Sequence, residues 1–237
     1  MVPLQNILFL DIETVSQYAS FEGLPDEWKE LWTRKAEGLL RNRENQTVET
    51  VYERAAIYAE FGKIVCISCG VVQVTGPERK LLLKSFSGHD EKTLLSSFCD
   101  TISKWAQEGN KYLCAHNGKE FDFPYLCRRM VINDVCIPGM LAVSGKKPWE
   151  VNHIDTMELW KFGDFKSYTS LNLLACALGI KSPKDDIDGS MVGSIYWNTH
   201  DLSRIVHYCQ KDVVTVAQVY LRLNNEPLIL PENIEVR

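Results

Sequence analysis

Residues 7–13 read Ile7-Leu8-Phe9-Leu10-Asp11-Ile12-Glu13, an apolar run that ends in two acids one residue apart. Side chains two apart on a β-strand point to the same face, so this stretch predicts a strand that presents two carboxylates together where its apolar part ends. Like charges so placed repel each other unless a cation lies between them. A divalent ion such as Mg²⁺ fits there, because hard cations prefer carboxylate oxygens. The alternative is an ordinary strand end with two solvated acids.

Two later segments carry acids in similar settings. The first is Ala115-His116-Asn117-Gly118-Lys119-Glu120-Phe121-Asp122, in which Asn-Gly is a turn signal and the last two residues open a helical pattern. The second is Tyr208-Cys209-Gln210-Lys211-Asp212, inside a helical pattern at 202–223. A tyrosine four residues before an aspartate lies on the same helix face as that aspartate.

Together the three segments resemble the exonuclease motifs of the DnaQ-like superfamily with four acidic residues, in its tyrosine-type branch, called DEDDy. The similarity is greatest to stand-alone exonucleases related to the proofreading domain of family B DNA polymerases, whose motifs are Asp-x-Glu, Asn-x-x-x-Phe-Asp and Tyr-x-x-x-Asp. Here the motifs are Asp11 to Glu13, Asn117 to Asp122, and Tyr208 to Asp212. The resemblance covers residues 5–224 and has softer matches at Ile154 to Met157 and Ser170 to Ala175.

The order of strand and helix patterns predicts an α/β fold. Strand patterns lie at 6–11, 63–74, 80–86, 111–115 and 152–155, and helical patterns lie at 91–105, 121–130, 169–178 and 202–223. This order favours a mixed five-stranded sheet flanked by helices, and the resemblance implies a ribonuclease H-like topology with the first strand in the centre. A helical insertion at 16–61 is expected between strands one and two, with helices from Asp26 and at 48–58.

Length and composition indicate one globular domain spanning 1–237. The chain has 45% hydrophobic and 24% charged residues, and nothing between its motifs has the composition of a linker. The N-terminal apolar run is short and leads into Asp11, so neither a signal peptide nor a membrane span is expected, and the predicted location is cytoplasmic. The net charge of −5 argues against tight nonspecific nucleic-acid binding, yet it allows an enzyme that grips only a chain end.

The eight cysteines are scattered through apolar patterns, which is typical of small buried hydrophobes in a cytosolic protein. Cys66 and Cys69 are the one close pair, and they fall within a strand pattern. A structural zinc site would need a second pair of ligands at similar spacing, and the sequence shows none. We therefore expect structural cysteines.

The resemblance implies a metal-dependent 3′ to 5′ exonuclease that releases nucleoside monophosphates from the 3′ end of nucleic acid, with single-stranded DNA favoured. Two divalent ions, Mg²⁺ or Mn²⁺ in its place, are expected on four acids: Asp11, Glu13, Asp122 and Asp212. Tyr208 is expected to orient the attacking water. Contacts with the terminal nucleotide are expected from three residues: Thr14, Asn117 and Phe121.

Other functions remain open at the level of sequence. RNA is an alternative substrate, because the motifs act on a phosphate that both nucleic acids share. A non-catalytic DnaQ-like module that binds nucleic acid or protein would be expected to lack at least one acid, and none is missing here. An endonucleolytic ribonuclease H is disfavoured by the Tyr-x-x-x-Asp motif. Because no polymerase sequence follows the motifs, a polymerase or repair partner would be a separate chain.

The third motif contains two candidates for the residue that serves the water. His207 stands five residues before Asp212, as in the histidine branch of the superfamily, and Tyr208 stands four before it. At about 100° per residue, a regular helix places Tyr208 about 40° and His207 about 140° from Asp212 around the axis. The uninterrupted helical pattern therefore favours the tyrosine.

Overall fold

The structure is a computed structural model that describes residues 2–41, 45–76, 78–164, 168–181 and 187–237. Its strands are β1 (Ile7–Ser16), β2 (Gly62–Thr75), β3 (Glu78–Ser87), β4 (Tyr112–Ala115), β5 (Ile154–Asp155) and β6 (Ile234–Val236). They form one mixed sheet in the order β5-β4-β1-β2-β3-β6. β2 pairs antiparallel with β1 and β3, whereas the pairs β1/β4, β4/β5 and β3/β6 are parallel. The fold is therefore a mixed α/β fold.

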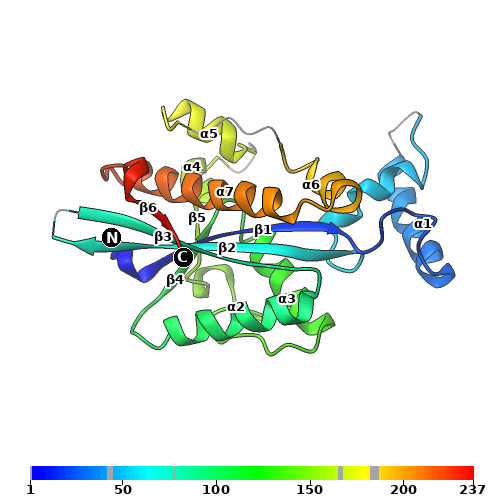
Figure 1. Ribbon diagram of the computed structural model, residues 1–237, viewed down its shortest axis with the longest axis horizontal. Helices are drawn as coiled ribbons and strands as arrows, with labels where there is room; N and C mark the ends of the chain where they lie inside the picture. Colours follow the sequence, from blue (N-terminus) through cyan, green and yellow to red (C-terminus); the bar gives the residue numbers. More distant parts are fainter. Residues whose placement is uncertain (1, 42–44, 77, 165–167, 182–186) are drawn as a thin grey trace.

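Helices cover both faces of the sheet (Figure 1). α7 (Leu202–Leu223) lies on one face, and α2 (Glu91–Trp105) with α3 (Asp122–Ile132) lies on the other. The first strand alternates between them, because Leu8 and Leu10 pack against the α2/α3 layer while Ile7 and Phe9 pack under α7. Shorter helical segments connect these parts: η1 (Leu4–Asn6), η3 (Pro148–Glu150), α4 (Thr156–Lys161), α5 (Leu171–Ala177), α6 (Val192–Ser194), the π-helical η4 (Ile195–Thr199) and η5 (Pro231–Asn233).

The sheet has a sixth strand, so the expectation of five strands is wrong. β6 adds in parallel to the outer edge of β3, in a segment where the sequence patterns indicate no strand. Ile234 packs against the core under α7, and Glu235 forms an ion pair with Lys80 of β3 at 2.7 Å. A three-residue strand is too short to show a clear alternation of apolar and polar residues. Its pairing also depends on the edge of β3, more than 140 residues away in sequence.

The first strand also continues beyond its apolar run. β2 pairs with it as far as Ser16, whereas the parallel pairing with β4 stops at Phe9. Asp11 and Glu13 therefore lie inside β1 rather than at its end, which corrects the sequence-based placement. On the β4 side, however, the paired residues of β1 end at Phe9, so both acids lie beyond the part of β1 that β4 covers.

The expected insertion between β1 and β2 is present, with one change. α1 (Asp26–Leu40) is an α-helix, but the second expected helix is the shorter 3₁₀-helix η2 (Thr50–Ile57). Trp32 is fully buried and makes edge-to-face ring contacts with Tyr52 and Phe61, at centroid distances of 5.3 and 5.1 Å. The insertion thus has an aromatic core of its own, beside the end of β1 (Figure 1).

Within the described residues, no helix combines the length and the apolar character needed to cross a bilayer. All eight cysteines are free thiols, and Cys66 and Cys69 are both buried in β2.

Candidate active site

Two acids of β1 face α7. The strand alternation that puts Phe9 and Val15 under α7 also puts Asp11 and Glu13 on that face. Glu13 is 7% exposed, while Asp11 keeps partial exposure and reaches the surface. A register shift follows Glu13, since Glu13 pairs with Cys66 but the next residue pairs with Ile64. Such bulges re-aim side chains, and they are common near active sites.

A third acid comes from the opposite layer. Asp122 is the first residue of α3 and is 4% exposed. Its carboxylate accepts hydrogen bonds from its own backbone N–H and from that of Ile12, which lies between the two acids of β1. The backbone of β1 thereby fixes Asp122 at the point where β4 no longer covers the strand.

The third motif supplies a fourth acid and a tyrosine from α7. The Tyr208 hydroxyl is hydrogen-bonded to Asp212, as expected for residues four apart on one helix face. Burial and the charges of Asp212, Glu13 and Asp11 raise the pKa of Tyr208, so its hydroxyl keeps its proton. His207 is exposed on the same helix, which runs through the motif without a break.

The four acids interact strongly with one another. Burial, and next the charges of the other acids, hold the pKa of Asp11 and of Glu13 well above their ordinary values. Burial also raises the pKa of Asp122 to about 7, against two backbone N–H bonds that lower it. The charge of Asp212 acts on all three of these carboxyl groups.

Three acids of this cluster have no ion-pair partner within the described part of the chain. None of the ion pairs among the described residues includes Asp11, Glu13 or Asp122. Buried carboxylates are normally paired with cations or bound to metals, since an isolated buried charge is very costly. The donor set consists of hard oxygens, which suits Mg²⁺ or Mn²⁺. The residues present therefore fit a divalent metal centre.

The loop before α3 is shaped by Asp155, the last residue of β5. Its carboxylate accepts backbone N–H bonds from Asn117 at 2.9 Å, Lys119 at 3.1 Å and Met157 at 2.9 Å. Asn117 adopts a φ of 61°, a left-handed conformation that asparagine tolerates better than most residues. The carboxylate therefore stabilises the turn that leads to Asp122.

The three expected substrate contacts lie around this site. The Asn117 side-chain oxygen is buried and has no hydrogen-bond partner among the described residues. Phe121 is half-buried and packs its ring against Tyr125, at a centroid distance of 5.3 Å. Thr14 is also half-buried, and its side chain is hydrogen-bonded to the Tyr125 hydroxyl. An orphaned buried amide oxygen is costly, and a ligand donor would satisfy it.

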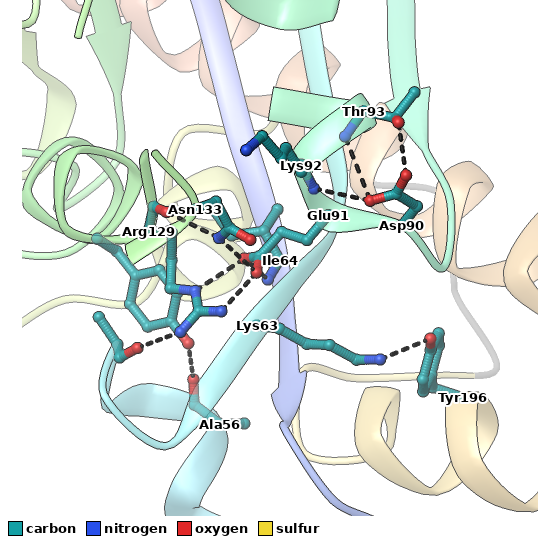
Figure 2. Close-up of polar contacts among 12 residues, drawn as sticks. Ala56, Lys63, Ile64, Asp90, Glu91, Lys92, Thr93, Arg129, Asn133 and Tyr196 are labelled. Carbon is teal, nitrogen blue, oxygen red and sulfur yellow. Dashed lines mark hydrogen bonds and ion pairs between the residues drawn. The ribbon is translucent and has the colours of Figure 1, made fainter. Parts of the chain in front are cut away.

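A buried ion pair anchors the helix that carries Asp122, and sequence reasoning missed it. Figure 2 shows the Glu91 carboxylate of α2 accepting from the Arg129 guanidinium of α3, from Asn133 and from the backbone N–H of Ile64. Arg129 also donates to the Ala59 carbonyl of the insertion at 2.8 Å. The ion pair thereby joins α2, α3, β2 and the end of the insertion. Its two charged residues are 38 positions apart, and no local pattern links them.

Cys209 was expected to be an inert buried hydrophobe, but it also touches the acids. It is fully buried on α7, and its sulfur lies 3.5 Å from Asp11 Oδ2 and 3.4 Å from the Asp11 carbonyl oxygen. Its thiol is also hydrogen-bonded to Cys66, the residue opposite Glu13 in β2. The signal in the sequence is its spacing, three residues before Asp212 and hence on a neighbouring part of the helix surface.

Residues 57–227 match the model of a family described as predicted 3′-5′ exonucleases related to the exonuclease domain of PolB. The chain belongs to this family. The matched range of this PolB-exonuclease relative contains three candidate site residues: Asp122, Tyr208 and Asp212. It begins after the other two, Asp11 and Glu13. The structure nevertheless brings these two acids close enough for the charges of Asp122 and Asp212 to act on them.

No curated protein matches the sequence of this family member. Among solved structures, it is similar to the family B DNA polymerase from the hyperthermophilic archaeon Pyrobaculum calidifontis. The two share 16% sequence identity, with a TM-score of 0.49 over 93% of this chain. The chain spans 25% of the length of that polymerase.

Proposed function

We propose that the protein is a metal-dependent 3′ to 5′ exonuclease that removes nucleoside monophosphates from single-stranded DNA. The observation that carries the proposal is the convergence of four acids from β1, α3 and α7, with no protein cation among the described residues paired to Asp11, Glu13 or Asp122. Family membership supports the direction of cleavage. The strand order β3-β2-β1-β4-β5 within the sheet supports a ribonuclease H-like core in a single domain spanning 1–237.

Asp11, Glu13, Asp122 and Asp212 would hold the metal ions. Two bound divalent ions, Mg²⁺ or Mn²⁺, would supply a nucleophilic hydroxide at neutral pH and offset the charge that develops on the phosphate oxygens. The partial exposure of Asp11 leaves one side of the cluster open to a phosphodiester. On the other side of the cluster, Glu13 and Asp122 are buried.

Tyr208 acts on the attacking water. Its hydroxyl already contacts Asp212 and stays protonated, so it orients the water by hydrogen bonding and does not remove its proton. The attacking water releases one proton to solvent as its oxygen bonds to phosphorus in line, the bond to the departing 3′ oxygen breaks, and that oxygen takes up a proton from solvent. The products are a nucleoside 5′-monophosphate and a strand one nucleotide shorter.

Three residues would bind the terminal nucleotide without reading its sequence. The unpartnered amide oxygen of Asn117 would accept a hydrogen bond from the sugar or base, and the backbone at Thr14 would approach the 3′ hydroxyl. Phe121 would stack on a base, an interaction worth about 1–3 kcal/mol for any base. RNA would also satisfy these contacts, so an exoribonuclease is the alternative within the same chemistry.

Digestion of 5′-labelled single strands of DNA and RNA with Mg²⁺ tests the proposal. We expect products that shorten stepwise from the 3′ end, and we expect EDTA or Asp11→Ala to abolish them. Asp100→Asn, at an exposed position on α2, is the control for removal of an acid. Undiminished hydrolysis by a folded Asp11→Ala protein would overturn the metal assignment, and binding without hydrolysis would indicate a non-catalytic module. Faster digestion of RNA would reassign the substrate.

A further inference from the structure

A thiol belongs to the same cluster as the acids of β1. One donor atom from each of Asp11, Glu13 and Cys209 can be chosen so that all three lie within 4.8 Å of one another. The sulfur of Cys209 points at Asp11, with 3.5 Å between Sγ and Oδ2. Cys209 and Glu13 are both buried.

These separations suit a small tetrahedral ion. Zn²⁺ binds sulfur at about 2.3 Å and carboxylate oxygen at about 2.0–2.2 Å, so its ligand atoms lie about 3.3–3.7 Å apart. The Sγ to Oδ2 separation at Asp11 already falls in this range. The other pairs would need to contract by at most about 1.5 Å, within the reach of side-chain rotation.

Glu13 is a buried acid of this group, and the thiol of Cys209 is held in place from behind. Glu13 is 7% exposed, and its carboxylate is hydrogen-bonded to Asp11, another acid. None of the ion pairs among the described residues includes Glu13. Opposite Glu13, Cys66 holds the Cys209 side chain by a hydrogen bond, as partners behind metal ligands often do.

The donor set of two carboxylates and one thiol is not that of a magnesium site. Mg²⁺ takes oxygen ligands and keeps much of its water, whereas thiolate favours borderline and soft dications such as Zn²⁺, Co²⁺ and Cd²⁺. We propose that Asp11, Glu13 and Cys209 form a carboxylate–thiolate site for zinc-class ions, which inhibit the enzyme by occupying ligands that Mg²⁺ needs. On binding, the thiol loses its proton and a sulfur–metal bond forms, with one proton released to solvent.

Binding of Co²⁺ to the metal-free protein tests the site without any reference to catalysis. We expect Co²⁺ to produce an intense near-ultraviolet band from thiolate-to-cobalt charge transfer, and equimolar Zn²⁺ to remove it. Cys209→Ser should lose the band, and Cys209→Ala serves the same purpose if the serine variant fails to fold. Cys114→Ser is the matched control, because Cys114 is equally buried, on β4. Co²⁺ binding without the band, or a band that persists without Cys209, would overturn the proposal.

The inhibitory consequence rests on the proposed nuclease function and has its own measurement. The rate of each variant with Mg²⁺ is taken as its reference, and Zn²⁺ is then titrated against it. We expect the Zn²⁺ concentration for half inhibition to rise at least tenfold in Cys209→Ser and to stay unchanged in Cys114→Ser. Equal inhibition of the two variants by Zn²⁺ would refute the proposal that Zn²⁺ inhibits through Cys209. Absence of any nuclease activity would refute the proposed function, while the cobalt band still decides the site.

Discussion

Replacing Asp122 by asparagine should stabilise the metal-free protein while abolishing its activity. The pKa of Asp122 in the folded protein is about 7, raised mainly by burial. An unfolded aspartate has a pKa of about 3.9. Between these values the folded state binds the extra proton, so the free energy of unfolding falls as pH rises from about 4 to about 7. A shift of about 3 units corresponds to about 4 kcal/mol lost by the wild-type protein at alkaline pH.

Asp122→Asn removes this titration and keeps an oxygen that can accept from Ile12. The variant should therefore exceed the wild type in unfolding free energy by up to about 4 kcal/mol near pH 8, and the gap should shrink towards pH 5. Urea unfolding in EDTA measures both values, with Asp100→Asn as the exposed control. Mg²⁺ at about 100 times its dissociation constant should add about 2.7 kcal/mol to the wild type, and less to the variant. A gap that is absent, or that is the same at both pH values, would refute the reasoning.

Four further substitutions test the candidate site and the residues that support it. Glu91→Ala leaves the buried Arg129 charge unpaired, so it should lower the free energy of unfolding, measured with urea, by about 3–5 kcal/mol. Replacing both partners by apolar residues should lower it less. A decrease below about 1 kcal/mol for Glu91→Ala would contradict this reasoning. Tyr208→Phe should slow hydrolysis by about 100-fold because the water is no longer oriented, while His207→Ala at its exposed position should have little effect; the reverse result would assign the histidine branch. A Cβ atom at Gly118 would lie 2.4 Å from the Cβ of Ala115, at the end of β4. Gly118→Ala should therefore lower the free energy of unfolding by about 1–3 kcal/mol and reduce the rate of hydrolysis. An unchanged melting curve would argue against this contact.

The long helices could be predicted from sequence because their signals are local. α2 and α7 begin and end where the 3.6-residue pattern does, and each follows an aspartate that caps its first turn, Asp90 and Asp201. The acids of the candidate site were found in the same way, from short motifs with fixed spacing. That they meet in space was implied by the family resemblance rather than by any of the motifs alone.

The features that sequence did not reveal depend on contacts between distant segments. β6 exists because β3 offers it an edge, and β1 continues to Ser16 because β2 is long enough to pair with it. The partners Glu91 and Arg129 lie on separate helices, so neither helix pattern marks them. Cys209 fitted the apolar side of α7, and only the packing of α7 on β1 brings its sulfur to Asp11.

The insertion packs around an aromatic core of its own, apart from the acids of the candidate site. Trp32 and its neighbours pack among residues of the insertion itself, and a few hydrogen bonds, such as that from Tyr125 to the Ala56 carbonyl, join it to α3. Substitutions on its outer surface are therefore expected to leave the acids of the candidate site in place. The outer surface of the insertion could therefore vary between related chains while the acids of the candidate site keep their positions.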